Sequence, residues 1–291
     1  MNPEMICILF GIIIIESIII SFLLRRKIKK ACRMIKNALC RPSENSREIH
    51  FTDEQDAWYT DLPLMILHGA ANGRRCYSNS EEGIIRGAEN GFKVIEVDVS
   101  RTSDGCFVLS HRFRPDGEII FDKTPSLEEF LREGASENET ALTFQDLLRR
   151  FGSKNVFFLI DCTHGTEAEF CQWISENTEI SQRSCLIFQV HTPQMLKKVY
   201  DAGTFRYIHY NGTSEDVVRH LGLLQKCGVH SCSISDEEIS DNNSSLDQLI
   251  RSGIHIIVYT VNHQRRLEKL LQKGIGGVFT DVLTPDSLRQ K

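Results

Sequence analysis

The sequence lacks the short motifs by which several common protein classes are recognised. None of its ten cysteines forms a CxxC pair, and histidine or cysteine spacing typical of a zinc site is missing. A glycine-rich dinucleotide fingerprint and a P-loop are also absent. Positive charge is scarce beyond the N-terminal region, because residues 42–291 carry 26 basic and 37 acidic side chains, a net charge of −11. These features argue against a zinc module, a nucleotide-binding fold and a nucleic-acid partner.

A long apolar run lies near the N-terminus. Residues Met5–Leu24 are almost wholly apolar, and as a helix they would measure about 30 Å, close to the hydrocarbon thickness of a bilayer. Eight Lys and Arg residues follow within 25–41, whereas Glu4 is the only charged side chain before the run. Positive charge next to a membrane helix stays on the cytoplasmic side. The pattern predicts an uncleaved single-pass anchor in the cell membrane, with the remaining chain in the cytoplasm and its cysteines reduced.

The composition divides the chain into three parts. Residues 1–24 hold the predicted transmembrane helix and a short tail, residues 25–60 form a basic collar and polar linker, and residues 61–291 form one folded domain. In the third part, short apolar runs alternate with amphipathic stretches, a pattern that predicts parallel βαβ units. The strand candidates are Leu64–Leu67, Lys93–Val97, Val156–Ile160, Cys185–Val190, Phe205–His209, Ser231–Ile234, Ile254–Thr260 and Gly277–Thr280.

Eight such strands over about 225 residues predict an α/β fold, a closed (β/α)8 TIM barrel. The alternative is an open, doubly wound sheet, which the missing glycine-rich fingerprints make less favourable. Nearly sixty residues separate the second strand from the third. Within them, Asp104-Gly105 lies between apolar runs and predicts a small hairpin inserted after the second strand, which ends at His111.

Ionisable residues end the first three strand candidates, and active sites of TIM barrels lie at these ends. His68 follows the first strand, Glu96 and Asp98 end the second, and Asp161 ends the third. Glu96 and Asp98 are two residues apart and therefore point to the same face. Two neighbouring carboxylates repel each other unless a cation or proton lies between them. With Asp161 they offer three oxygen ligands, a set suited to Mg²⁺ or Ca²⁺.

Seven spaced motifs resemble the glycerophosphodiester phosphodiesterase family. They are HG at 68–69, YSNS at 77–80, GFKVIEVDV at 91–99, TSDG at 102–105, VLSH at 108–111, YTVN at 259–262 and GGVFTD at 276–281. The resemblance covers residues 64–288, which is nearly the whole chain after the linker. The ordered series is specific, although no single motif would be.

The resemblance implies a TIM barrel in which a divalent metal, Mg²⁺ or Ca²⁺, is held by Glu96, Asp98 and Asp161. It also implies an acid/base pair, His68 and His111, with the two roles left open between them. In such enzymes a glycerol hydroxyl attacks phosphorus, a cyclic phosphate forms, an alcohol leaves and water opens the ring. The expected substrates are glycerophosphodiesters or lysophospholipid-like molecules.

Three positions depart from the family pattern. The family usually has Arg where this chain has Gly69, Lys where it has Thr163, and Trp where it has Tyr259. Arg74, in the loop after the first strand, offers a replacement positive charge. Polar residues at the ends of later strands complete the expected pocket. The predicted substrate-binding residues are Tyr259, Gln189, Asn262, Arg74 and Thr163.

Two other functions stay open. Loss of two phosphate-binding cations is consistent with an inactive barrel that binds phosphate head groups at a membrane. A cyclising phospholipase related to sphingomyelinase D would account for the same motifs. Metal-dependent turnover of glycerophosphocholine distinguishes the hydrolase from the inactive barrel, and analysis of the products distinguishes it from the cyclising enzyme.

Overall fold

The structure is a computed structural model, and it describes residues 58–59, 63–71, 73, 76–113, 121, 123–134, 138–152, 155–163, 165–240 and 243–288. The predicted transmembrane helix, the basic collar, most of the linker and Arg74 lie outside these residues. Within the described part of the chain, no helix is both long enough and apolar enough to cross a bilayer.

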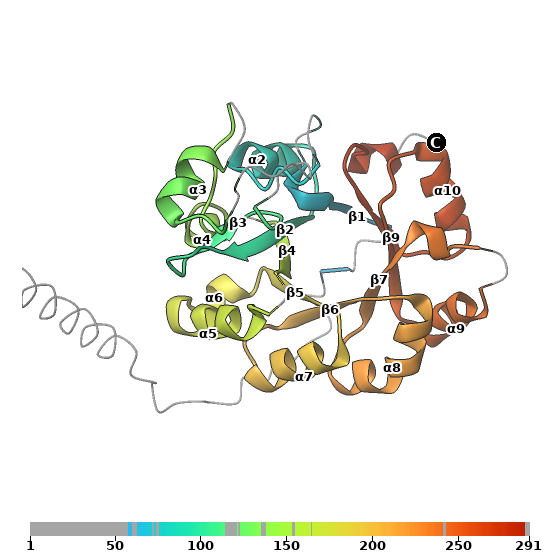
Figure 1. The fold of residues 1–291 in the computed structure, drawn as a ribbon. Helices are drawn as coiled ribbons and strands as arrows, with labels where there is room; N and C mark the ends of the chain where they lie inside the picture. Colours follow the sequence, from blue (N-terminus) through green and yellow to red (C-terminus); the bar gives the residue numbers. More distant parts are fainter. Residues whose placement is uncertain are drawn as a thin grey trace, which may run out of the picture. The chain divides into compact units, whose positions relative to one another are not determined.

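Eight parallel strands in the described residues close into a barrel (Figure 1). They are β1 (Leu64–Leu67), β2 (Val94–Arg101), β4 (Phe157–Cys162), β5 (Leu186–Val190), β6 (Tyr207–Asn211), β7 (Ser231–Ser235), β8 (His255–Tyr259) and β9 (Gly277–Thr280). Neighbours pair in chain order, and β1 pairs with both β9 and β2, so the sheet closes on itself. The predicted (β/α)8 barrel is confirmed.

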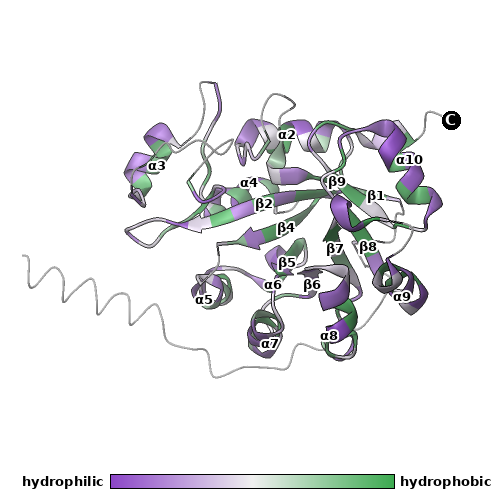
Figure 2. Cartoon of the chain, turned by 45° about the vertical axis from the view of Figure 1, so that its right-hand side comes forward, coloured by the Kyte–Doolittle hydropathy of each residue, from purple (hydrophilic) through white to green (hydrophobic). Residues whose placement is uncertain are grey.

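Helices surround the barrel. They are α2 (Glu81–Glu89), α3 (Leu127–Glu133), α4 (Phe144–Phe151), α5 (Glu167–Asn177), α6 (Ile180–Arg183), α7 (Pro193–Ala202), α8 (Ser214–Lys226), α9 (Ser244–Ser252) and α10 (Gln264–Gln272), with 3-10 turns η2 (His68–Ala70), η4 (Asp236–Glu238) and η5 (Pro285–Leu288). Thr143, Thr192 and Thr213 accept a hydrogen bond from the N–H three residues later, which fixes where α4, α7 and α8 begin. The helices carry polar residues outward, whereas the strands are largely apolar (Figure 2).

The insertion after β2 starts with the predicted hairpin. Strand β3 (Phe107–Leu109) pairs antiparallel with the end of β2, with Ser100 opposite Val108. Gly105 has φ +91°, a conformation that glycine adopts without steric cost, and it closes the turn. The N–H of Ser110 then donates to the carbonyl oxygen of Asp98, which ties the residue before His111 to the end of β2. Helix α3, which the sequence pattern did not predict, lies further along the insertion.

Two apolar layers stabilise the domain: one between strands and helices, and one inside the barrel. The inner layer consists of Trp58, Leu64, Ile66, Val94, Leu159, Ile187, Ile257 and Phe279. Trp58 is only 4% exposed, and its ring lies 5.7 Å from that of His209 on β6. Tyr59 lies 4.4 Å from the ring of His255, at the start of β8. The barrel interior therefore includes aromatic residues that come from within the stretch assigned to the linker, 25–60.

The buried position of Trp58 predicts a large stability cost when its ring is removed. Trp58→Ala should destabilise the domain by about 3–5 kcal/mol, the usual cost of deleting a buried Trp or Phe ring. Urea unfolding followed by circular dichroism measures this value. Tyr200→Ala, at an exposed position on α7, is the matched control and should change stability by less than about 1 kcal/mol. Equal stability of the two variants would show that Trp58 is not part of the barrel core.

Candidate active site

Three carboxylates meet on β2 and β4. Asp161 is near the C-terminal end of β4, whereas β2 continues past Glu96 and Asp98, and past the predicted strand end at Val97, to Arg101. Asp98 and Asp161 are direct partners in the register of these two strands, and Glu96 lies two residues before Asp98 on the same face. One oxygen from each carboxylate can be chosen so that all three lie within 4.8 Å of one another. Glu96 and Asp98 are nearly buried, at 3% and 6% exposure. The structure thus brings together the three acidic residues that the sequence pattern singled out.

Each carboxylate is oriented by a hydrogen-bonding group from outside the cluster. The backbone N–H of Gly69 donates to Glu96 Oε2. Asn79 Nδ2 donates to Asp98 Oδ2 over 2.8 Å, and His191 Nε2 lies 2.8 Å from Asp161 Oδ1. Each of these bonds engages one oxygen of its carboxylate, so the cluster is held in place by its surroundings. Such supporting contacts are typical of the residues around metal ligands.

The crowding of the three carboxylates raises the pKa values of Glu96 and Asp98. Burial, together with the charges of Asp98 and Asp161, raises the pKa of Glu96 well above its usual value. Burial and the charge of Asp161 raise the pKa of Asp98 to about 7. A divalent cation would offset this repulsion, and three carboxylate oxygens are the donors that Mg²⁺ and Ca²⁺ prefer. The donor set therefore fits a hard divalent cation.

His68 lies beside a carboxylate from the other end of the domain. Its Nδ1 is 2.9 Å from Oδ1 of Asp281, the residue that follows β9. Asn262 holds Asp281 from two sides: its Nδ2 donates to Asp281 Oδ2 over 2.7 Å, and its Oδ1 accepts from the Asp281 N–H over 2.8 Å. Although burial raises the pKa of Asp281, the hydrogen bonds of His68, Asn262 and Cys76 and the charge of His68 together lower it below its usual value. Asp281 is therefore an ionised acceptor, and His68 Nδ1 must be the donor.

Tyr77 joins the two predicted acid/base residues. Its ring stacks on His111, with centroids 4.5 Å apart and planes 16° apart. The edge contact with His68 has centroids 4.6 Å apart and planes at 66°. His68 follows β1 and His111 follows the inserted hairpin, so the Tyr77 ring lies between side chains of two separate loops. Arg112, next to His111, is exposed, and its positive charge offsets a small part of the rise in the pKa of Asp98.

The remaining predicted substrate-binding residues have different surroundings. Gln189, on β5, is 3% exposed, and its Oε1 has no hydrogen-bond partner among the described residues. Burial raises the pKa of Tyr259, and the charges of Glu238 and Asp161 raise it further. Thr163 Oγ1 hydrogen-bonds to Ser100 Oγ at 2.9 Å. Their roles, and that of Arg74, stay predictions.

Three residues of the cluster, Tyr77, Asn79 and Asp281, were assigned no role from the sequence. His191 was considered only among the strand-end residues able to line the pocket. Tyr77 and Asn79 belong to the YSNS motif and Asp281 ends the GGVFTD motif, so their place in the motifs was the available signal. His191 follows β5 directly, and strand-end position was its signal. Their partners, however, lie in distant parts of the sequence.

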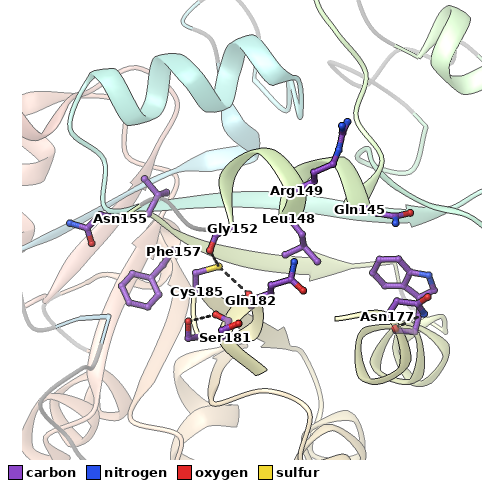
Figure 3. Close-up of a pocket in the computed structure, with 13 residues that line it drawn as sticks. Gln145, Leu148, Arg149, Gly152, Asn155, Phe157, Asn177, Ser181, Gln182 and Cys185 are labelled. Atoms are coloured by element: carbon purple, nitrogen blue, oxygen red, sulfur yellow. Dashed lines mark hydrogen bonds between the residues drawn. The ribbon is translucent and has the colours of Figure 1, made fainter. Parts of the chain in front are cut away.

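A large cavity lies away from this cluster. It measures about 870 Å³ and is lined by α4, by the C-terminal part of α5, by α6 and by residues at the start of β4 and just before β5 (Figure 3). The thiol of Cys185 at its wall donates to the carbonyl oxygen of Gln182, with the two atoms 3.3 Å apart. Because Phe157 is the first residue of β4 and Cys185 directly precedes β5, this cavity is at the opposite end of the barrel from the carboxylates.

Comparison with known proteins agrees with this geometry. The model of the glycerophosphoryl diester phosphodiesterase family matches residues 68–284. No curated protein matches the chain significantly in sequence. Among solved structures, a glycerophosphoryl diester phosphodiesterase from Parabacteroides distasonis is 16% identical with a TM-score of 0.61, and the alignment covers 78% of this chain and 86% of that one.

Two further solved structures share the fold. A glycerophosphodiester phosphodiesterase from Thermotoga maritima is 20% identical with a TM-score of 0.57, covering 75% of this chain and 94% of that one. A phosphodiesterase from Oleispira antarctica, solved in complex with the product sn-glycerol-3-phosphate, is 18% identical with a TM-score of 0.57, covering 77% of this chain and 95% of that one. At these identities the likeness shows the fold.

The acidic cluster predicts an unusual pH dependence of stability without divalent cations. Because the pKa values of Glu96 and Asp98 are raised in the fold, these two groups bind more protons in the folded than in the unfolded chain above about pH 4, so their contribution to stability falls as the pH rises towards about 7. Asp98→Asn should flatten this fall and raise the melting temperature at neutral pH in EDTA. It should also lose most of the stabilisation that Mg²⁺ or Ca²⁺ gives the wild type.

Scanning calorimetry at several pH values, with EDTA or with each cation, measures these effects. Asp201→Asn, at an exposed position on α7, serves as the matched control and should behave as the wild type. If Asp98→Asn keeps the wild-type pH profile and cation response, Asp98 is not part of a crowded cation site.

Proposed function

The chain belongs to the glycerophosphoryl diester phosphodiesterase family of phosphodiester hydrolases, and on this premise we propose that it cleaves glycerophosphodiesters with a divalent cation held by Glu96, Asp98 and Asp161. The observation that carries the proposal is the meeting of three carboxylates and two histidines at one end of the barrel. A bound divalent cation lowers the pKa of a coordinated hydroxyl and offsets phosphate charge.

His68 is the base in this proposal. Ionised Asp281 accepts a hydrogen bond from the Nδ1–H of His68. The other ring nitrogen of His68, Nε2, therefore carries the lone pair that acts as the base. Nε2 takes the proton of the glycerol hydroxyl as its oxygen bonds to phosphorus. Asp281 then stabilises the imidazolium, as a carboxylate does beside a catalytic histidine. Asn262 acts indirectly, because it keeps Asp281 in position.

His111 is the acid. It protonates the leaving alcohol oxygen as the bond from that oxygen to phosphorus breaks. The cyclic phosphate that forms is opened by water, with the two histidines exchanging roles: His111 removes a proton from water and His68 returns one to the glycerol oxygen. The Tyr77 ring contacts both histidines and so helps to fix the position of the His111 ring relative to His68.

A substrate with a glycerol phosphate moiety is supported by one structural neighbour. The Oleispira antarctica phosphodiesterase was solved with its product sn-glycerol-3-phosphate. Glycerophosphocholine and lysophosphatidylcholine both contain this moiety, the first as a soluble molecule and the second with one acyl chain. The proposed substrate class therefore includes soluble glycerophosphodiesters and lysophospholipid-like molecules.

A membrane anchor forms part of the proposal and rests on the sequence. The apolar run Met5–Leu24 is long enough to span a bilayer, and the positive charge that follows it favours a cytoplasmic domain. The basic segment 25–41 is attracted to anionic lipids by about 1 kcal/mol per Lys or Arg. This arrangement would keep the enzyme near substrates released from the inner leaflet.

Activity assays on the full chain in detergent test the proposed chemistry. With Mg²⁺ or Ca²⁺, glycerophosphocholine should yield sn-glycerol-3-phosphate and choline, and EDTA should abolish turnover. His68→Ala and His111→Ala should each lower kcat by about 10² or more, the usual contribution of a positioned proton-transfer group. His230→Ala, at an exposed position before β7, should keep wild-type turnover. Activity that survives full chelation would contradict the cation assignment.

The products and the substrate range separate the alternatives. A stable cyclic phosphate as the final product would favour the cyclising phospholipase. Wild-type protein that binds glycerol phosphates but turns over no substrate, with either cation, would instead favour the inactive head-group-binding barrel. Each outcome contradicts the hydrolase proposed here.

Protease protection tests the proposed topology. In intact cells expressing the chain with a C-terminal reporter, external protease should leave the domain uncut, and detergent should expose it. The expected protection follows from the positive charge after Met5–Leu24. Removal of the basic residues in 25–41 is the informative variant, because it should weaken the orientation preference. Glycosylation at Asn211 in a eukaryotic host would place the domain on the other side.

A further inference from the structure

Tyr77 occupies an uncommon position beside the two histidines. It lies between η2 and α2 with φ +54°, a backbone conformation that non-glycine residues rarely adopt. In this conformation its ring contacts both His68 and His111, at centroid distances of 4.6 and 4.5 Å. The backbone is thus held in a costly conformation where the side chain meets the proposed acid and base.

The position of Tyr77 depends on the absence of a side chain at Gly69. A Cβ built on Gly69 would lie 2.6 Å from Tyr77 Cα and 2.9 Å from Tyr77 Cδ1, closer than real Cβ atoms approach. Gly69 also has φ +53°, and its N–H donates to Glu96. The two residues are therefore coupled, because any side chain at position 69 would displace Tyr77.

The hydroxyl group of Tyr77 is a hydrogen-bond donor with no acceptor among the described residues. Burial raises its pKa above the usual value, and the negative charges of Glu96, Asp98 and Asp281 raise it further. The phenol therefore stays protonated over the whole physiological range. It lies near an acidic cluster, where a substrate phosphate needs donors in addition to a cation to offset the repulsion of the carboxylates.

We propose that Tyr77 is a substrate-binding catalytic residue whose hydroxyl donates a hydrogen bond to a non-bridging oxygen of the phosphodiester. The inference rests on the proposed function, in which both histidines reach the same phosphorus. A phosphorus atom within reach of His68 and His111 is also near the ring that touches both of them. The neutral donor adds to substrate binding without competing with the cation for the carboxylates.

Tyr77→Phe isolates the hydroxyl, because phenylalanine keeps the ring contacts. We expect kcat/KM for glycerophosphocholine to fall about tenfold or more, the range for loss of a hydrogen bond to a charged group, with an unchanged pH profile and melting temperature. The affinity for sn-glycerol-3-phosphate, measured by calorimetry with Mg²⁺, should weaken in parallel. Tyr200→Phe, on exposed α7, is the matched control and should equal the wild type.

Gly69→Ala tests the coupling. By displacing Tyr77 it should lower kcat/KM at least as much as Tyr77→Phe, and the double variant should be no slower than Gly69→Ala alone, because both changes remove the same contact. Additive losses in the double variant would overturn the proposed coupling.

The outcomes separate this inference from the proposed function. An active wild type with an equally active Tyr77→Phe variant, or equal affinities of the two for sn-glycerol-3-phosphate, would overturn the role of the hydroxyl and leave the hydrolase intact. A wild type that neither turns over glycerophosphocholine nor binds sn-glycerol-3-phosphate would overturn the proposed function, and the role of Tyr77 with it.

Discussion

Closure of the barrel by β1 is the constraint on which the candidate site depends. Leu67, the last residue of β1, is paired with Ile95 on β2 and with Thr280 on β9. His68 and Asp281, which directly follow Leu67 and Thr280, are thereby brought to the same end of the barrel. They are in contact although they are 213 positions apart in the chain. An open sheet with the same strands would leave this contact unmade, because β1 and β9 would be separate edges.

The rim that closure creates is costly in the absence of a ligand. The negative charges of Glu96, Asp98 and Asp161 repel one another, and burial of the first two removes the water that would screen this repulsion. Neighbouring loops hold the carboxylates through the Gly69 N–H, Asn79 and His191. The same glycine admits the Tyr77 ring. In the proposed mechanism, cation binding, acid–base chemistry and the space for the substrate are thus linked through one short loop.

Local patterns explain why much of the fold was predictable. The strands are short apolar runs covered on both faces, and threonine caps mark where α4, α7 and α8 start. The hairpin was likewise predictable, because Asp104-Gly105 is a dipeptide typical of the tight turn between two antiparallel strands. Helix α3 was missed because it is short and lies inside an insertion without a neighbouring strand pattern. The inward position of Trp58 was missed because a single aromatic residue in a polar stretch has no periodicity.

The sequence by itself determined the alternation of strands and helices, the hairpin insertion and the common face of Glu96 and Asp98, because periodicity and turn chemistry depend on neighbours in the chain. Only the tertiary structure decided that Asp281 pairs with His68, that His191 pairs with Asp161 and that Tyr77 lies over Gly69. These contacts join residues on different strands or loops, and no local pattern encodes the distance between them. The sequence therefore predicted which carboxylates and histidines could carry the chemistry. The folded, closed sheet decided which other residues contact and orient them.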